Sequence, residues 1–337
     1  MRRRKKILIF GGKRVLGNSI VKQISLNNEV FCVSRTPQKE EVPNVEYLRG
    51  DVTNRNFLTS LSTRNYDVLI DNLAYDEHHV GMVYDVLKNN IAKYILTSSS
   101  WVYKFMDLKP PFHDIQCNEV ALKFPGDTLK DTADYVSGKI KAENKAAELW
   151  GSCIIVRIPM VFGENDHTDR LKFVVKRLLD HKPIILIDGG TNEFQIAYAP
   201  DIARLYESLF SVEEQSNLWL NLANPEIYTP KEFYELCANF LDISELSFID
   251  VDENEIHKTS YDYWQAEPFF REKRHLLNCT KLHKIFQDVK FSERTKWLKE
   301  ICLYEKKGIE LSPKQNSRFS GEMELIDSYG NSCGKLV

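Results

Sequence analysis

A tyrosine and a lysine four residues apart, Tyr135 and Lys139, could carry out proton transfer. They lie in a segment predicted to be a helix from Asp131 to Trp150, where side chains at positions i and i+4 share one face. A neighbouring ammonium favours the phenolate, so the tyrosine can exchange a proton near neutral pH instead of near its usual pKa of about 10. The pair therefore predicts acid–base chemistry at a hydroxyl or carbonyl group, which is half of nicotinamide redox chemistry.

The same spacing occurs a second time, at Tyr84 and Lys88. That pair falls on an amphipathic stretch without a serine-rich strand before it, and we interpret it as an ordinary surface pair. Tyr135 has a different context, because the serines Ser98–Ser100 follow an apolar strand predicted at Lys93–Thr97.

A glycine-containing turn, Gly11–Gly17, separates the first predicted strand, Lys6–Phe10, from the first predicted helix, Val15–Leu26. The first glycine permits a tight turn, the last permits close packing of helix on sheet, and the N–H groups at the helix start can hold a pyrophosphate. Arg14 occupies the position of the middle glycine of the dinucleotide fingerprint. A purely structural turn is the alternative, but the placement favours a cofactor site made by Gly11, Gly12, Arg14, Val15, Leu16 and Gly17.

The residues after the second predicted strand, Glu29–Ser34, bear on the choice of nicotinamide cofactor. An acidic residue there would bind the ribose 2′-hydroxyl of NAD, but this chain has Ser34 and Arg35. Arg35, with Arg14 or Lys13, can pair with a 2′-phosphate through charge-assisted hydrogen bonds. We therefore expect NADP, with NAD as the alternative if Arg35 stacks on the adenine without discriminating.

Strands and helices alternate through the first half of the chain. This pattern predicts an α/β fold with a doubly wound parallel Rossmann sheet, covered by helices on both faces and binding ligands beyond the carboxyl ends of its strands. We expect an NAD(P)-binding domain at residues 1–163 with a return segment at about 194–225, a smaller C-terminal substrate-binding region at 164–311, and a polar tail at 312–337.

Composition narrows the class of protein. The 337 residues contain no apolar run long enough for a transmembrane helix, and the four apolar residues Ile7–Phe10 are too few for a signal peptide. Seven scattered cysteines without a Cys-x-x-Cys pair, and histidines without ligand-like spacing, predict a cytoplasmic protein with no metal site. The net charge is −3, and because the first six residues carry +5, the remaining chain carries about −8, which disfavours nucleic acid as a partner. A homodimer is expected only from the general frequency of two-fold assemblies.

Together these motifs resemble the extended short-chain dehydrogenase/reductases, the NAD-dependent epimerase/dehydratase family. The glycine turn, with its basic residue, resembles that of an atypical subgroup of this family. The subgroup includes chloroplast RNA-binding relatives. The matching segments occur in the family order through about two-thirds of the chain: 11–17, 50–51, 72–74, 97–103, 135–139, 157–163 and 194–203.

The resemblance implies roles for individual residues. Tyr135 would be the general acid/base, Ser99 would hydrogen-bond the reacting oxygen, and Lys139 would bind the nicotinamide ribose and lower the pKa of the tyrosine. The further cofactor contacts that it implies are Asp51 and Val52 near the adenine, Leu73 and Ala74 at the phosphates and ribose, and Pro159 at the nicotinamide.

Departures from the family pattern bear on the substrate. A long insert, Lys104–Lys130, precedes Tyr135 and could cover the site. Ser100 and Trp101 replace the acidic pair that the resemblance associates with sugar 4,6-dehydratases, so that reaction is disfavoured. Gln195 stands where sugar-nucleotide epimerases often have an arginine. The candidate substrate contacts are therefore Ser100, Tyr103, Gln195, and the aromatic residues Tyr261 and Trp264, which either stack on a substrate ring or pack within their own region.

We expect an oxidoreductase or epimerase that acts on a secondary alcohol or ketone of a nucleotide sugar or a related polar small molecule. One alternative is an NADPH-dependent ketone reductase of a biosynthetic tailoring pathway. Another is a non-catalytic RNA-binding protein of the same fold, against which the intact Ser99, Tyr135 and Lys139 argue. An unrelated flavodoxin-like or methyltransferase sheet has no reason to place this pair after a serine-rich strand.

Overall fold

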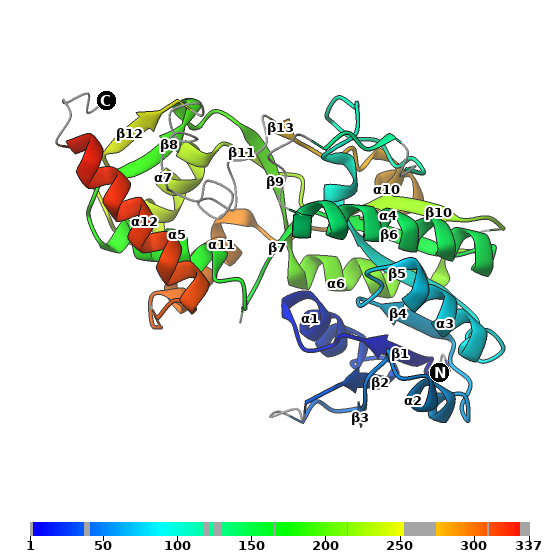
Figure 1. The fold of residues 1–337 in the computed structure, drawn as a ribbon. Helices are drawn as coiled ribbons and strands as arrows, with labels where there is room; N and C mark the ends of the chain where they lie inside the picture. Colours follow the sequence, from blue (N-terminus) through cyan, green and yellow to red (C-terminus); the bar gives the residue numbers. More distant parts are fainter. Residues whose placement is uncertain are drawn as a thin grey trace. The chain divides into compact units, whose positions relative to one another are not determined.

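The computed structural model describes residues 3–36, 41–117, 121–124, 130–164, 166–213, 215–252, 274–308 and 310–330. The chain forms two compact units (Figure 1). Unit 1 comprises Met1–Gly163, Ile196–Asn224 and Leu277–Lys290, and unit 2 comprises Glu164–Gln195, Pro225–Leu276 and Phe291–Val337. The predicted Tyr–Lys pair and glycine turn both belong to unit 1.

Unit 1 is built on a seven-stranded sheet whose neighbouring strands are all parallel. The strand order is β10-β6-β5-β4-β1-β2-β3, so the order reverses beside β1, as in a doubly wound fold. This confirms the predicted Rossmann architecture. The strands are β1 (Lys6–Phe10), β2 (Glu29–Ser34), β3 (Val45–Arg49), β4 (Val68–Asp71), β5 (Tyr94–Ser99), β6 (Ile154–Ile158) and β10 (Leu218–Asn221).

Helices cover both faces of this sheet (Figure 1). Helix α1 (Val15–Ile24) packs against α6 (Ala199–Ser208), whereas α3 (Glu77–Leu87) packs against both α2 (Arg55–Leu61) and α4 (Lys130–Trp150). Because both faces are covered, the central strands are apolar along nearly their whole length instead of alternating. The charged exceptions in the interior are Asp71, a fully buried acid at the end of β4, and the fully buried Arg157 of β6.

Local sequence signals explain where these helices begin. The side chain of Asn54 accepts hydrogen bonds from the backbone of Asn56 and Phe57 at the start of α2, and Asp76 accepts one from His79 N at the start of α3. Shorter elements complete unit 1: the 3₁₀ turns η1 (Ser100–Tyr103) and η4 (Leu209–Ser211), strand β7 (Met160–Phe162), which pairs with the end of β9 (Glu193–Tyr198), and helix α10 (Thr280–Ile285).

Unit 2 contains smaller sheets and four helices among its described residues. Strand β8 (Ile184–Ile187) pairs in parallel with β12 (Phe248–Val251), and the start of β9 pairs with β11 (Ile227–Tyr228) and β13 (Arg274–His275). Thr229 and Glu232 form a capping box at the start of one of the helices of unit 2. The helices are α5 (Arg170–Leu179), α7 (Pro230–Phe240), α11 (Arg294–Glu305) and α12 (Pro313–Gly330), and a 3₁₀ turn, η3, spans Asp188–Gly190.

The segment expected to be a polar tail contains the last helix, α12. Its Glu322 is fully buried and accepts a hydrogen bond of 2.8 Å from Arg177 Nε of α5, and its Leu325 and Ile326 are also buried. Residues 313–330 are therefore part of unit 2, held by a buried ion pair. Across the described residues, no helix combines the length and the apolar character needed to cross a bilayer.

Candidate active site

The turn between β1 and α1 requires its glycines. Gly11 has a φ of +78°, and a Cβ atom on Gly17 would lie 2.0 Å from the carbonyl oxygen of Gly11. A Cβ on Gly12 would lie 2.3 Å from Cys32 Sγ. Helix α1 therefore begins directly against the turn, and its N-cap residue Arg14 makes no side-chain capping bond. Such a helix start can hold a pyrophosphate, so the local geometry fits a dinucleotide.

Cationic side chains stand beside the end of β2. Lys13 Nζ donates a 2.7 Å hydrogen bond to Thr36 Oγ1, and the hydroxyl of Ser34 donates to the carbonyl of the same threonine. Arg35 is exposed. Lys13 and Arg35 thus flank one loop at the carboxyl end of β2, where a ribose 2′-phosphate would bind in the predicted site.

The residues predicted to border the adenine and the phosphates differ in exposure. Asp51 accepts hydrogen bonds from Thr53 N (2.9 Å) and Thr53 Oγ1 (2.8 Å), and these bonds lower the pKa of its carboxyl. Val52 is buried in the hydrophobic core. Leu73 lies against the glycine turn, because a Cβ on Gly11 would approach its side chain to 3.0 Å.

Lys139 is the most constrained residue of the site. The residue is only 3% exposed, and its ammonium group donates to the carbonyl oxygens of Ala74 (2.8 Å) and Thr97 (3.1 Å). The ring of Tyr75 faces the ammonium with its centroid at 4.5 Å. Burial lowers the pKa of Lys139 to about 8, while the negative charge of Asp71 opposes the shift. Its charge is thus held between the ends of β4 and β5.

Tyr135 lies one helical turn before Lys139 on α4 and is partly exposed. Two aromatic side chains flank its ring, with centroids at 6.3 Å for Tyr75 and 6.5 Å for Trp101. Ser99, the last residue of β5, is also partly exposed, and its hydroxyl accepts a 3.2 Å hydrogen bond from Trp101 N. The predicted acid/base and lysine therefore lie in the first half of α4, and the predicted serine lies at the end of β5.

Two of the predicted substrate contacts lie in the interior instead. Ser100 and Tyr103 have no exposed surface. The hydroxyl of Tyr103 donates to Asn221 Oδ1 (2.8 Å) and accepts from Arg157 Nη1 (2.7 Å), while its ring stacks on Phe112. The 3₁₀ turn η1 directs this tyrosine into the core, where it belongs to the same hydrophobic cluster as Val136 and Ile140 of α4.

The other predicted contacts are placed as follows. Pro159 is buried between β6 and β7. Gln195 belongs to β9 in unit 2, where it is 7% exposed and stands opposite Ile227. Tyr261 and Trp264 lie outside the described residues.

The insert before Tyr135 packs on the site helix in its described part, residues 104–117 and 121–124. Phe105, Phe112 and Cys117 share a hydrophobic cluster with Val136 and Ile140 of α4. The second Tyr–Lys pair behaves as expected for a surface pair, because Lys88 is exposed and its ammonium only stacks over the ring of Tyr84.

Sequence reasoning missed a buried polar network beneath Lys139. The carboxylate of Asp71 accepts hydrogen bonds from Leu73 N (2.9 Å) and the Tyr94 hydroxyl (2.9 Å), and lies 2.8 Å from His79 Nε2. A signal was present, since an acid at the end of a buried apolar strand is rare unless it is paired. Its partners on α3 and β5 could not be read from the sequence.

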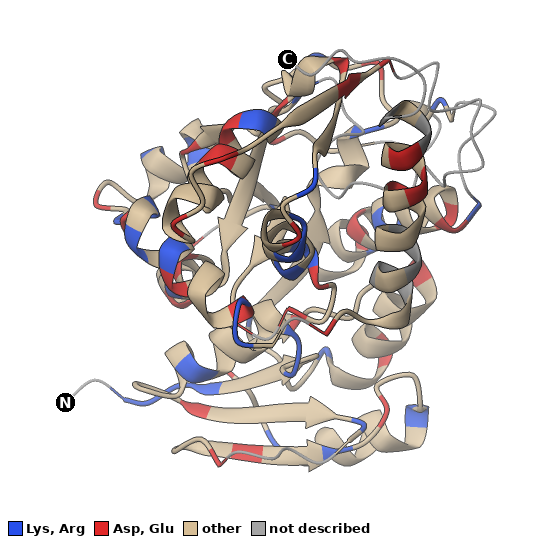
Figure 2. Ribbon diagram, turned by 90° about the vertical axis from the view of Figure 1, so that its left-hand side faces the viewer, with Lys and Arg blue, Asp and Glu red and all other residues tan. Residues whose placement is uncertain are grey.

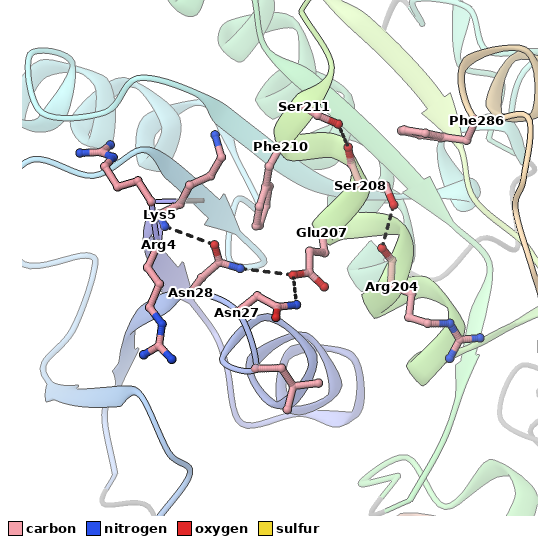
Figure 3. A pocket seen from close by; sticks show the side chains of 12 residues that line it. Arg4, Lys5, Asn27, Asn28, Arg204, Glu207, Ser208, Phe210, Ser211 and Phe286 are labelled. Atoms are coloured by element: carbon pink, nitrogen blue, oxygen red, sulfur yellow. Dashed lines mark hydrogen bonds between the residues drawn. The ribbon is translucent and has the colours of Figure 1, made fainter. Parts of the chain in front are cut away.

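A hollow of about 960 Å³ lies beside the residues that precede β1, whereas the glycine turn follows the other end of that strand (Figure 3). Arg4 and Lys5 line one side and Arg204 the other, around Glu207, which accepts hydrogen bonds from Asn27 Nδ2 (3.0 Å) and from two other amide side chains. The hollow adjoins the carboxyl ends of α1 and α6, whose partial negative charge accounts for cations there. None of the predicted site residues lines it, so we assign it no role in the proposed chemistry.

Comparison with known proteins supports the fold. No family model matches the chain. The chain is 21% identical over 294 residues to the chloroplast stem-loop binding protein of 41 kDa b of Arabidopsis thaliana, which covers 82% of this chain and 73% of that protein.

Solved structures with the same fold include NAD-bound enzymes of sugar nucleotides. The enzyme WbmH of Bordetella bronchiseptica, in complex with NAD⁺, aligns with a TM-score of 0.69 and 13% identity, over 91% of this chain and 100% of that one. The UDP-N-acetylglucosamine 4-epimerase of Bacillus cereus aligns with a TM-score of 0.67 and 17% identity, over 92% and 99%. The dTDP-glucose 4,6-dehydratase of Bacillus anthracis, in complex with NAD, aligns with a TM-score of 0.66 and 15% identity, over 90% and 97%. At these identities the similarity shows the shared fold, which is the fold that the sequence predicts.

Proposed function

We propose that this chain is an NAD(P)-dependent oxidoreductase or epimerase that acts on a secondary alcohol or ketone of a nucleotide sugar or a related polar metabolite. The observation that carries the proposal is the buried Lys139 ammonium, held by the Ala74 and Thr97 carbonyls one turn after Tyr135. The shared fold with the NAD⁺-bound enzyme WbmH, the NAD-bound dehydratase and the 4-epimerase supports it.

Each residue has a defined task in this proposal. Tyr135 takes or gives the proton at the substrate oxygen, and the positive charge of Lys139 favours its phenolate form. Ser99 hydrogen-bonds the same oxygen and so fixes its position. The glycine turn, whose close approach to α1 leaves no room for side chains, holds the pyrophosphate. The nicotinamide, when bound, supplies or accepts the hydride.

NADP is the proposed cofactor. Lys13 and Arg35 stand beside the end of β2, where a 2′-phosphate would bind, and the two residues directly after this strand, Arg35 and Thr36, are not acidic. We also propose that Gln195, Tyr261 and Trp264 contact the substrate. The protein is proposed to act in the cytoplasm as a homodimer. Net reduction exchanges the cofactor every turnover, whereas epimerisation retains it, so copurifying NAD would favour an epimerase.

Titration with NADPH and NADH, followed by nicotinamide fluorescence, is the first test. We expect tighter binding of NADPH, and an Arg35→Ala change should weaken NADPH about tenfold while leaving NADH nearly unchanged, because only NADPH carries the 2′-phosphate. Preferential binding of NADH would overturn the NADP assignment. Binding of neither dinucleotide would contradict the proposed function as a whole.

The catalytic role of Tyr135 is tested in the same preparation with a panel of nucleotide sugars and polar ketones. Tyr135→Phe should lower turnover at least about 10²-fold, as loss of a general acid/base does, with dinucleotide affinity preserved. The matched control is Tyr84→Phe, which alters the surface Tyr–Lys pair and should leave turnover unchanged. Full turnover in Tyr135→Phe would exclude the mechanism.

A second candidate function is the binding of structured RNA. The observation that favours it is the similarity to a protein named as a stem-loop binding protein. Figure 2 shows Asp and Glu segments in red as well as Lys and Arg segments in blue on the described helices. Together with the net charge of −3, this favours the enzyme over the RNA-binding protein.

A further inference from the structure

The buried carboxylate of Asp71 calls for an explanation beyond folding. Asp71 has no exposed surface, and a buried charge destabilises a protein by several kcal/mol unless it is paired. Burial favours its neutral form, but the charge of His79 and the hydrogen bonds that it accepts lower the pKa of the Asp71 carboxyl. The same pairing raises the pKa of His79 against the effect of burial. The protein therefore maintains a negative charge inside unit 1.

A short chain of contacts joins this charge to the site. Asp71 Oδ1 accepts from Leu73 N at 2.9 Å, which closes a turn over Asn72 directly after β4. The next residue, Ala74, presents its carbonyl oxygen to Lys139 Nζ at 2.8 Å. Asp71 thus fixes the loop that holds the Lys139 ammonium.

The charge of Asp71 also acts on Lys139 directly. Two carboxylates oppose the effect of burial on Lys139, first Asp71 and then Glu143. Glu143 is paired with Arg157, whose Nε donates a 3.0 Å hydrogen bond to Glu143 Oε1. The guanidinium of Arg157 does not lose a proton, so the positive charge of this pair does not change with pH. The ionisable partner of Asp71 is instead His79, whose pKa is raised by the Asp71 charge against the effect of burial. The attraction between the Asp71 carboxylate and the Lys139 ammonium can therefore vary with the protonation of His79.

The other groups that face this network are neutral or lie further along it. Tyr94 donates its hydroxyl to Asp71, and burial raises its pKa well above the ordinary value. Cys153 beside it also has a pKa raised by burial. Asp76, at the N-cap of α3, acts on His79 and adds to the stabilisation of its charged form. The uncharged ring of Tyr75 covers the far side of the ammonium.

We propose that Asp71 is a positioning residue for Lys139: it fixes the Ala74 carbonyl and supplies the negative charge that keeps Lys139 an ammonium group at neutral pH. This inference rests on the proposed function, in which Lys139 serves Tyr135 and the nicotinamide ribose. When His79 loses its proton, the Asp71 charge is no longer compensated and attracts the Lys139 ammonium more strongly. The protonation of His79 therefore changes how firmly Lys139 keeps its positive charge.

The test is an NMR titration of Lys139 in the full chain labelled with ¹³C-lysine, with its signal assigned by its loss in Lys139→Met. Asp71→Asn keeps the shape and can still accept from Leu73 N, but removes the charge. We expect the Lys139 midpoint to fall by at least about half a pH unit in Asp71→Asn, and NADPH affinity at pH 7.5 to fall at least about fivefold. The matched control is Tyr94→Phe, which removes one hydrogen bond to Asp71 and leaves its charge. In this variant the acid dissociation constant of Lys139 and the NADPH affinity should each change by no more than about twofold.

An unchanged Lys139 midpoint in folded Asp71→Asn would overturn the proposal. If that variant does not fold, His79→Gln decides, because it leaves the Asp71 charge without a cationic partner and must move the midpoint upward; no movement would equally overturn the proposal. The Lys139 titration needs no cofactor. A wild-type protein that binds neither NADH nor NADPH would therefore contradict the proposed function, while the titration still judges the role of Asp71.

Discussion

Lys139 combines three properties that a core lysine rarely has together. Its ammonium group is buried, it donates to carbonyls at the ends of two neighbouring strands, and a tyrosine lies one turn earlier on its helix. Burying an ammonium destabilises the folded state, so a chain without need of that charge would carry an apolar residue here. The proposed chemistry needs the positive charge of Lys139, while burial of that charge lowers the free energy of unfolding, and this loss can be measured.

The stability of the protein should carry a pH signature of Lys139. Burial lowers its pKa from 10.5 to about 8 in the folded state, so between these pH values the unfolded chain binds more protons at this site. Unfolding free energy of the wild type should therefore rise with pH over this window relative to Lys139→Met, by up to about 3 kcal/mol. Urea unfolding of both proteins at pH 7, 8, 9 and 10 measures the difference, in which other titrating groups cancel. A difference that is constant with pH would refute a buried, charge-bearing Lys139.

Residue spacing predicted the elements of the site better than it predicted the orientation of side chains. Tyr135 and Lys139 lie on the predicted helix, and Ser99, expected just after a strand, is the last residue of β5. Tyr103 points inward because the 3₁₀ turn after β5 rotates it towards Arg157 and Asn221, and no spacing rule forecasts that rotation. Asp71 was overlooked because its partners come from α3 and β5, which are distant in sequence.

At the scale of elements, the hydrophobic runs at Lys6–Phe10, Glu29–Ser34 and Lys93–Thr97 predicted β1, β2 and β5 to within two residues. Those runs are unambiguous because helices cover both faces of the sheet. Strands β7 and β9 escaped prediction, since residues 160–162 and 196–198 become strands only by pairing with each other. Helix α12 was mistaken for part of a tail because a buried ion pair between Glu322 and Arg177, rather than a broad apolar face, holds it in place.

The junction of β1 and α1 gives a prediction at this scale. A Cβ in Gly17→Ala would lie 2.0 Å from the Gly11 carbonyl oxygen, which is backbone and cannot rotate away. Helix α1 would have to shift off the turn, so we expect a loss of about 2–3 kcal/mol in unfolding free energy and a loss of dinucleotide affinity of at least about tenfold, because the pyrophosphate contact depends on that turn.

Gly81 of α3 provides the matched control. A Cβ there has no atom within 4 Å, so Gly81→Ala should stabilise the protein by about 0.5–1 kcal/mol through helix propensity alone. Urea unfolding and NADPH titration of the two variants check both values. Equal behaviour of the two alanine variants would show that the turn tolerates a side chain, and the proposed pyrophosphate site would lose its structural basis.

At the scale of the whole molecule, charge separates the two candidate functions. The chain has a net charge of −3 although its first six residues carry +5. Nucleic-acid affinity that does not depend on sequence comes from cations that neutralise phosphates. Acidic as well as basic residues lie along the described helices (Figure 2), although α5 carries basic residues only. The net negative charge disfavours a polyanion, whereas a dinucleotide needs only a local site.

Stem-loop RNA should therefore bind weakly and through the N-terminal run. We expect a Kd no tighter than about 10⁻⁶ M at 150 mM salt, because binding of this strength is non-specific. Replacing Arg3, Arg4 and Lys5 by serine should abolish even that binding, while NADPH affinity stays unchanged, since these residues precede β1 at the edge of the sheet opposite the glycine turn. Fluorescence anisotropy with a labelled stem-loop at 50 and 200 mM salt measures the affinity and its salt dependence. Nanomolar binding that persists in both the triple-serine variant and Tyr135→Phe would favour the RNA-binding function over the enzyme.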